Sequence, residues 1–71
     1  MSITAAQAQE LLTGNHTFSQ LGLSMLVTRL KSSYAKDSSQ ASLQKCANEI
    51  NTFLEKYSSI IVADLAVISE L

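Results

Sequence analysis

Apolar side chains recur every three or four residues through the C-terminal part of the chain, residues 43–71. This spacing places them on one side of a helix, and neither proline nor glycine interrupts the run. The stripe consists of Leu43, Ala47, Ile50, Leu54, Tyr57, Ile61, Leu65 and Ile68. The opposite side carries the polar residues Lys45, Asn48, Thr52, Glu55 and Lys56. The pattern predicts an amphipathic helix over about 40–70.

The last part of this predicted helix has no continuous polar side. Asp64 and Glu70 are the only charged residues within 60–71. Apolar side chains fill the sides and back of the helix there: Ile60, Val62, Ala63, Ala66 and Val67. A helix that is apolar on most of its circumference is buried on more than one side. We therefore expect a partner, either a second copy in a four-helix bundle or the groove of a different protein. The pair Ser58 and Ser59 leaves open a break into a separate fourth helix.

A short helix is predicted near the N-terminus, over Ala5–Thr13. Thr4 with Gln7 three residues later fits a capping box, which satisfies the first free N–H groups of a helix. The helix is expected to end at Gly14 and Asn15, since both residues tolerate the left-handed conformation that ends many helices.

A second helix is predicted over about 18–36, beginning at a second capping-box pattern formed by Thr17 and Gln20. Its main apolar stripe contains Leu23, Leu26, Val27, Leu30 and Tyr34. A second apolar patch, more than a quarter-turn away, contains Phe18, Leu21 and Met25. Gly22 lies between the two patches, where it permits close approach of a neighbour. The two patches predict two neighbours, one within the chain and one from another chain.

Together these segments predict an all-α fold. We expect one domain, residues 1–71, built as an antiparallel helical hairpin (about 18–36 and 40–70) with a short N-terminal helix (about 5–13). Three short polar residues favour a turn between the two long helices because their side chains compete for backbone hydrogen bonds; these are Asp37, Ser38 and Ser39. The lack of glycine and proline there leaves a continuous helix open.

Composition and charge narrow the function classes. The 71 residues are 46% hydrophobic and carry a net charge of −1, which argues against an electrostatic nucleic-acid binder or a basic helix on anionic lipid. The longest apolar stretch, 60–68, is too short to span a membrane and contains Asp64. Residues 1–12 lack the pattern of a signal peptide, and one cysteine forms no internal disulfide. We expect a cytoplasmic protein.

Candidate chemistry is sparse. His16 lacks the further ligands that a metal site needs, and we expect it on a surface loop. Cys46 lies at the edge of the apolar stripe, as a small buried residue does, and a nucleophile would also need a base and an oxyanion site. Asp64 either faces an interface with a basic partner or lies at a solvated edge. We expect no catalytic residue, metal or cofactor, and no enzyme activity.

Two runs resemble a known family. They are LSMLVTRLK at 23–31 and, after a short polar turn and a long helix, IIVADL at 60–65. Over residues 18–65 the chain is similar to the small co-chaperones of type III secretion needle subunits. The resemblance implies a cytoplasmic helical hairpin that binds a larger chaperone of tetratricopeptide-like fold, the two together keeping the needle subunit monomeric before export.

The resemblance also implies roles for particular residues. Five would hold the hairpin together: Leu23, Leu26, Leu30, Leu54 and Ile61. The surface left for the partner would consist of Phe18, Leu21, Met25, Ile60, Val62, Ala66 and Val67. The mechanism would be steric and hydrophobic rather than catalytic.

Two other functions stay open. The chain also resembles the needle subunit itself, a hairpin of similar length, although that family typically has prolines in its turn and this chain has none. The other alternative is a self-associating helical bundle with a regulatory or immunity role. A homo-oligomer is compatible with each of these hypotheses of function.

Overall fold

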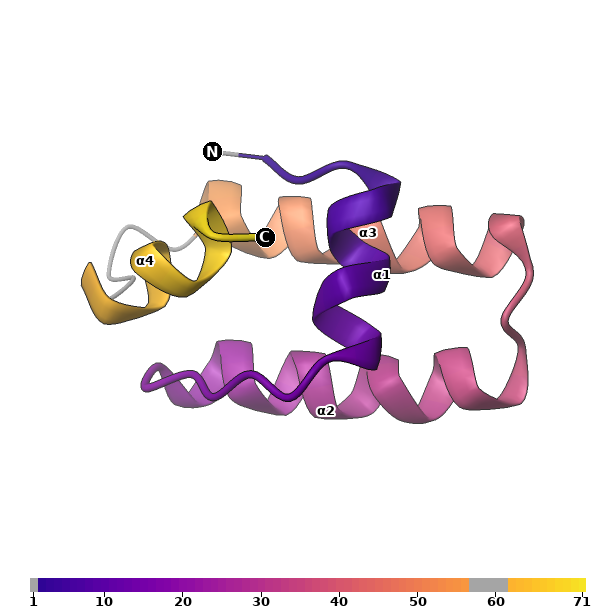
Figure 1. Ribbon diagram of the computed structural model, residues 1–71, viewed down its shortest axis with the longest axis horizontal. Coiled ribbons are helices and arrows are strands. Elements are labelled where there is room, and N and C mark those ends of the chain that lie inside the picture. The colour runs from indigo at the N-terminus through magenta and orange to yellow at the C-terminus, as the bar shows by residue number, and fades with distance from the viewer. Residues whose placement is uncertain (1, 57–61) are drawn as a thin grey trace.

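Four α-helices form the described parts of the chain, which are residues 2–56 and 62–71 of a computed structural model. They are α1 (Ala5–Thr13), α2 (Leu21–Lys36), α3 (Gln40–Lys56) and α4 (Val62–Ser69). Figure 1 shows α2 and α3 side by side in opposite directions, with α1 crossing both. The described residues include no strand. The all-α prediction and the antiparallel hairpin are confirmed.

The start of α1 is the predicted capping box. Thr4 Oγ1 accepts a hydrogen bond from Gln7 N at 3.1 Å, and Gln7 Oε1 accepts one from Thr4 N at 2.9 Å. The segment before the helix is fastened to α3, because the amide of Asn51 pairs with both backbone groups of Ile3. Ile3 N donates to Asn51 Oδ1 at 2.7 Å, and Asn51 Nδ2 donates to Ile3 O at 2.9 Å.

The predicted left-handed end of α1 is wrong. Gly14 is extended, with φ −85° and ψ −178°, and its N–H donates to Glu10 O. A glycine is needed here because of close approach: an added Cβ would lie 2.7 Å from His16 Nε2 and 2.8 Å from Glu10 O. Lys31 Nζ on α2 donates to Gly14 O at 3.1 Å and ties the end of α1 to the hairpin.

Helix α2 begins at Leu21, later than the predicted start at residue 18. The N-cap is Gln20 rather than Thr17, because Gln20 Oε1 accepts from Leu23 N at 2.6 Å. Within α2, Gly22 has the predicted role of permitting close approach. A Cβ there would lie 3.3 Å from two ring carbons of Phe53 on α3.

The predicted turn between α2 and α3 is confirmed. Asp37 Oδ1 accepts from Ser39 N at 3.1 Å, and Ser39 Oγ accepts from Ser42 N at 3.2 Å at the start of α3. The hydrogen bonds from Ser39 hold the pKa of Asp37 below its ordinary value of 3.8. Short polar side chains therefore satisfy the backbone here without glycine.

The expected single helix over about 40–70 is wrong. Figure 1 shows α4 turned back toward the middle of the molecule instead of extending the axis of α3. A straight helix of that length would measure about 45 Å, whereas the longest extent of the Cα trace is 31 Å. By turning back, α4 buries Ile68 in the shared core. The possible break at Ser58 and Ser59 lies outside the described residues.

The core is one cluster drawn from all four helices and from the segments before α1 and α2. The predicted stripe supplies five buried residues, Leu43, Ala47, Ile50, Leu54 and Ile68, while Leu65 is half-buried; Tyr57 and Ile61 lie outside the described residues. The other buried apolar residues are Ile3, Ala8, Leu11, Leu12, Phe18, Leu23, Val27, Leu30 and Cys46. The five polar residues predicted on the opposite side of α3 are exposed. In the described parts of the chain, no helix is both long enough and apolar enough to cross a membrane.

Candidate protein-interaction surface

Among the described residues, three large hydrophobic side chains remain exposed. Leu21 and Met25 on α2 are 72% and 63% exposed, and Val62 on α4 is 80% exposed. Leu21 and Met25 are four residues apart and therefore share one side of α2. Ala66, four residues after Val62, is also exposed. We call these four residues the apolar end surface.

Asp64 brings the two halves of this surface to the same end of the molecule. Its side chain is 1% exposed. Ser19 N donates to Asp64 Oδ1 at 2.7 Å, and Gln20 N donates to Asp64 Oδ2 at 2.9 Å. The carboxylate therefore lies at the N-terminus of α2, where the helix dipole favours negative charge. The first turn of α4 is thereby tied to residues 19 and 20, the segment directly before α2.

Both expectations for Asp64 are wrong, since it faces neither an interface nor solvent. Its partners are backbone N–H groups 44 and 45 residues earlier in the chain. Backbone donors carry no sequence signal, so periodicity did not identify this contact. The only hint in the sequence was a lone carboxylate inside an apolar segment.

The remaining residues predicted to bind a partner fall in different places. Phe18 is 7% exposed and belongs to the core, so it is not part of the candidate surface. Val67 is partly buried and packs against the core. Ile60 lies outside the described residues. Four of the seven predicted residues are therefore exposed, two on α2 and two on α4, and both helices begin at the same end of the molecule (Figure 1).

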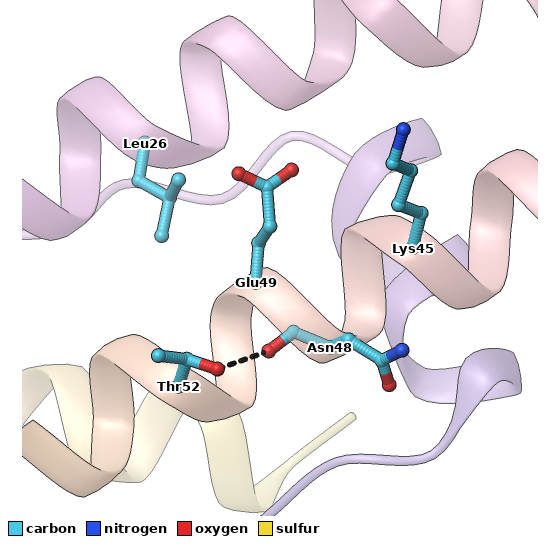
Figure 2. A pocket seen from close by; sticks show the side chains of 5 residues that line it. All are labelled: Leu26, Lys45, Asn48, Glu49 and Thr52. Atoms are coloured by element: carbon cyan, nitrogen blue, oxygen red, sulfur yellow. Dashed lines mark hydrogen bonds between the residues drawn. The ribbon is translucent and has the colours of Figure 1, made fainter.

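A shallow groove runs between α2 and α3. Figure 2 shows its lining, with Leu26 from α2 and the other four residues from α3: Lys45, Asn48, Glu49 and Thr52. Its volume is about 270 Å³. Arg29 Nη2 on α2 reaches Glu49 Oε1 at 2.8 Å. Both side chains are largely exposed, at 60% and 43%, so this ion pair contributes little to stability. The lining of the groove therefore combines one apolar residue, Leu26, with charged residues of both signs.

The groups with potential chemistry are placed apart from this surface. Cys46 is buried, and this burial, followed by the charge of Glu49, raises the pKa of the thiol. A raised pKa disfavours the nucleophilic thiolate. His16 lies in the segment between α1 and α2, beside Gly14. Within residues 2–56 and 62–71, no three His, Cys, Asp or Glu side chains are grouped to hold a metal.

Comparison of the chain with protein-family models, curated proteins and solved structures gave no significant match. The exposed apolar residues are therefore the structural feature from which a function can be inferred.

Proposed function

We propose that this protein is a non-catalytic binding protein whose apolar end surface packs against another protein. The observation that carries the proposal is the exposure of Leu21, Met25 and Val62 in a chain that buries most of its other large apolar residues. Water contact with such side chains is unfavourable by about 25 cal/mol per Å² of apolar area. Clustered exposed apolar side chains mark interaction sites.

The resemblance supplies a more specific form of this proposal. The protein would act in the cytoplasm as a co-chaperone of a type III secretion needle subunit, binding a larger helical-repeat chaperone and helping to keep the needle subunit unpolymerised. The antiparallel pair of α2 and α3 is compatible with this role, because the resemblance implies a helical hairpin. The contribution would be steric: apolar surface of the larger chaperone would be covered, with no cofactor or metal.

Co-expression with the products of neighbouring reading frames tests this proposal, with size exclusion and light scattering as the readout. We expect a stable mixed complex with a helical-repeat protein. Val62→Glu should weaken that complex at least ten-fold, about 1.4 kcal/mol, because it places a charge in the apolar end surface. Helix α4 should tolerate the change, because Val62 is exposed and a carboxylate is favourable in the first turn of a helix.

Thr52→Glu is the matched control, since it adds the same charge on the exposed polar side of α3. Equal weakening by the two substitutions would remove the apolar end surface from the proposal. A discrete homodimer or tetramer that ignores every neighbour would overturn the co-chaperone role and favour a self-associating bundle.

A further inference from the structure

The outer side of α2 has the repeat of a coiled-coil contact. Five exposed residues follow one another at alternating spacings of four and three: Leu21, Met25, Thr28, Ser32 and Ala35. Positions a and d of a heptad have this spacing and form the contact line between two paired helices. The line covers four turns of α2, about 21 Å at 1.5 Å per residue. We call these five residues the α2 seam.

The α2 seam differs from the outer side of α3 in the same molecule. A helix surface that faces only water is normally rich in charged residues, and α3 follows this rule with Lys45, Glu55 and Lys56, all exposed. The α2 seam contains no charged residue. The Thr28 hydroxyl donates to Ser24 O at 2.9 Å. A partner that covers Thr28 therefore does not leave this hydroxyl donor unsatisfied.

The charges beside the seam are all positive. Arg29, Lys31 and Lys36 occupy the positions that flank the contact line, and α2 contains no acidic residue. In paired helices the flanking positions select the partner by charge. Glu49 of α3 pairs with Arg29, and Lys31 Nζ donates to Gly14 O. Lys36 is exposed and is the flanking cation most available to a carboxylate of a partner.

These charges disfavour a second copy of α2 as the occupant. Parallel pairing would bring the cationic halves of two α2 helices together. Antiparallel pairing would place the cations of each helix against the N-terminus of the other, which is the positive end of the helix dipole. An acidic partner avoids both penalties.

We propose that the α2 seam binds an amphipathic helix of another protein, one with a narrow apolar stripe flanked by Asp or Glu. The small side chains of Thr28, Ser32 and Ala35 leave room for large apolar residues of that helix, while Leu21 and Met25 project between its side chains. This inference rests on the proposed function and deepens it by naming the chemistry of the partner.

Two synthetic helical peptides of three heptads test the inference. Both carry leucine at a and d; one has glutamate and the other lysine at every flanking position. Binding of each fluorescein-labelled peptide to the 71-residue chain is followed by anisotropy. We expect the glutamate peptide to bind at least ten-fold more tightly than the lysine peptide at low salt. The difference should shrink as salt is added, because salt screens exposed charges.

Substitutions locate the binding site. Met25→Glu should lower the affinity for the glutamate peptide at least ten-fold. Thr52→Glu, which adds the same charge to α3, should change this affinity less than two-fold. Lys36→Glu should lower the affinity for the glutamate peptide and raise the affinity for the lysine peptide. Met25 is 63% exposed, so the Met25→Glu chain should keep its helical circular dichroism and melting temperature.

Three results would overturn the inference: equal binding of the two peptides, binding of neither, or equal effects of Met25→Glu and Thr52→Glu. A homodimer that Met25→Glu dissociates would also do so, since it would identify a second copy as the occupant. Failure here is distinguishable from failure of the proposed function. A mixed complex that Val62→Glu and Met25→Glu both weaken, with neither peptide bound by the chain, would keep the function and remove only the seam.

Discussion

Replacing Asp64 by asparagine tests whether one buried carboxylate holds α4 to the rest of the fold. Asparagine keeps the shape of the side chain but offers one acceptor oxygen where aspartate offers two. One of the two backbone donors, Ser19 N or Gln20 N, then meets an NH₂ group instead of an oxygen. The substitution therefore removes one charge-assisted hydrogen bond and weakens the other.

The expected loss follows from the two contacts. Hydrogen bonds to a charged group contribute about 1.5–3 kcal/mol each, and the carboxylate also loses its favourable position at the α2 dipole, about 0.3–1 kcal/mol. Against this, asparagine avoids the cost of burying a charge. We expect Asp64→Asn to lower the free energy of unfolding by about 1.5–3 kcal/mol, which for a domain of this size lowers the melting temperature by about 6–24 °C.

Thermal and urea denaturation followed by circular dichroism measure the loss, and Asp37→Asn is the matched control. Asp37 also accepts a backbone hydrogen bond, from Ser39 N, but it is exposed and water can replace its oxygen. Its substitution should leave the melting temperature nearly unchanged. Hydrogen exchange should show the loss first in α4 and in the first turn of α2. If the two variants melt within about 2 °C of each other, Asp64 does not hold α4 in the way we describe.

Two further predictions concern the core and the end of α1. Gly14→Ala should destabilise the chain by about 1–3 kcal/mol in urea, because the added Cβ would lie 2.8 Å from the backbone oxygen of Glu10; Gly22→Ala should cost less, since its contacts are longer and alanine favours the helix. A larger loss at Gly22 than at Gly14 would contradict this ranking. Cys46 should react with Ellman's reagent far more slowly in the native chain than in urea, since burial both covers the thiol and raises its pKa. The contribution of the protonated thiol to the free energy of unfolding should be complete below its ordinary pKa of 9.0 and lost as pH rises through the higher pKa of the folded state. Equal rates of reaction with Ellman's reagent in the native and the unfolded chain would refute the burial of Cys46.

The sequence predicted correctly those helix ends and turns in which a side chain forms a hydrogen bond with nearby backbone. The capping box of Thr4 and Gln7 and the polar turn beginning at Asp37 depend on neighbours within three residues, and both are observed. The buried side of α3 was also predictable, since its stripe has a strict helical period. Such features are readable because cause and effect lie within one or two turns of the chain.

Long-range contacts decided the features that the sequence did not predict. The start of α2 at Leu21 accompanies the cap that Gln20 Oε1 forms with Leu23 N, while the segment before it is held by Asp64 of α4, which accepts from Ser19 N and Gln20 N. The turned-back position of α4 depends on burial of Ile68 among residues of other helices. The burial of Phe18 is also a long-range effect, because residues of other helices make up the cluster that contains it. Periodicity assigns such residues to a side of a helix but does not say what covers that side.

The placement of Asp64 links stability to the proposed binding surface. Helices α1, α2 and α3 supply most of the buried apolar residues, while α4 contributes Ile68. The apolar end surface, however, needs both α2 and α4, because Leu21 and Val62 belong to different helices. The contact from Asp64 to the start of α2 sets how these two side chains lie relative to each other. Under the proposed function, the carboxylate would therefore also fix this surface in advance of binding, and such preorganisation lowers the ordering cost of association.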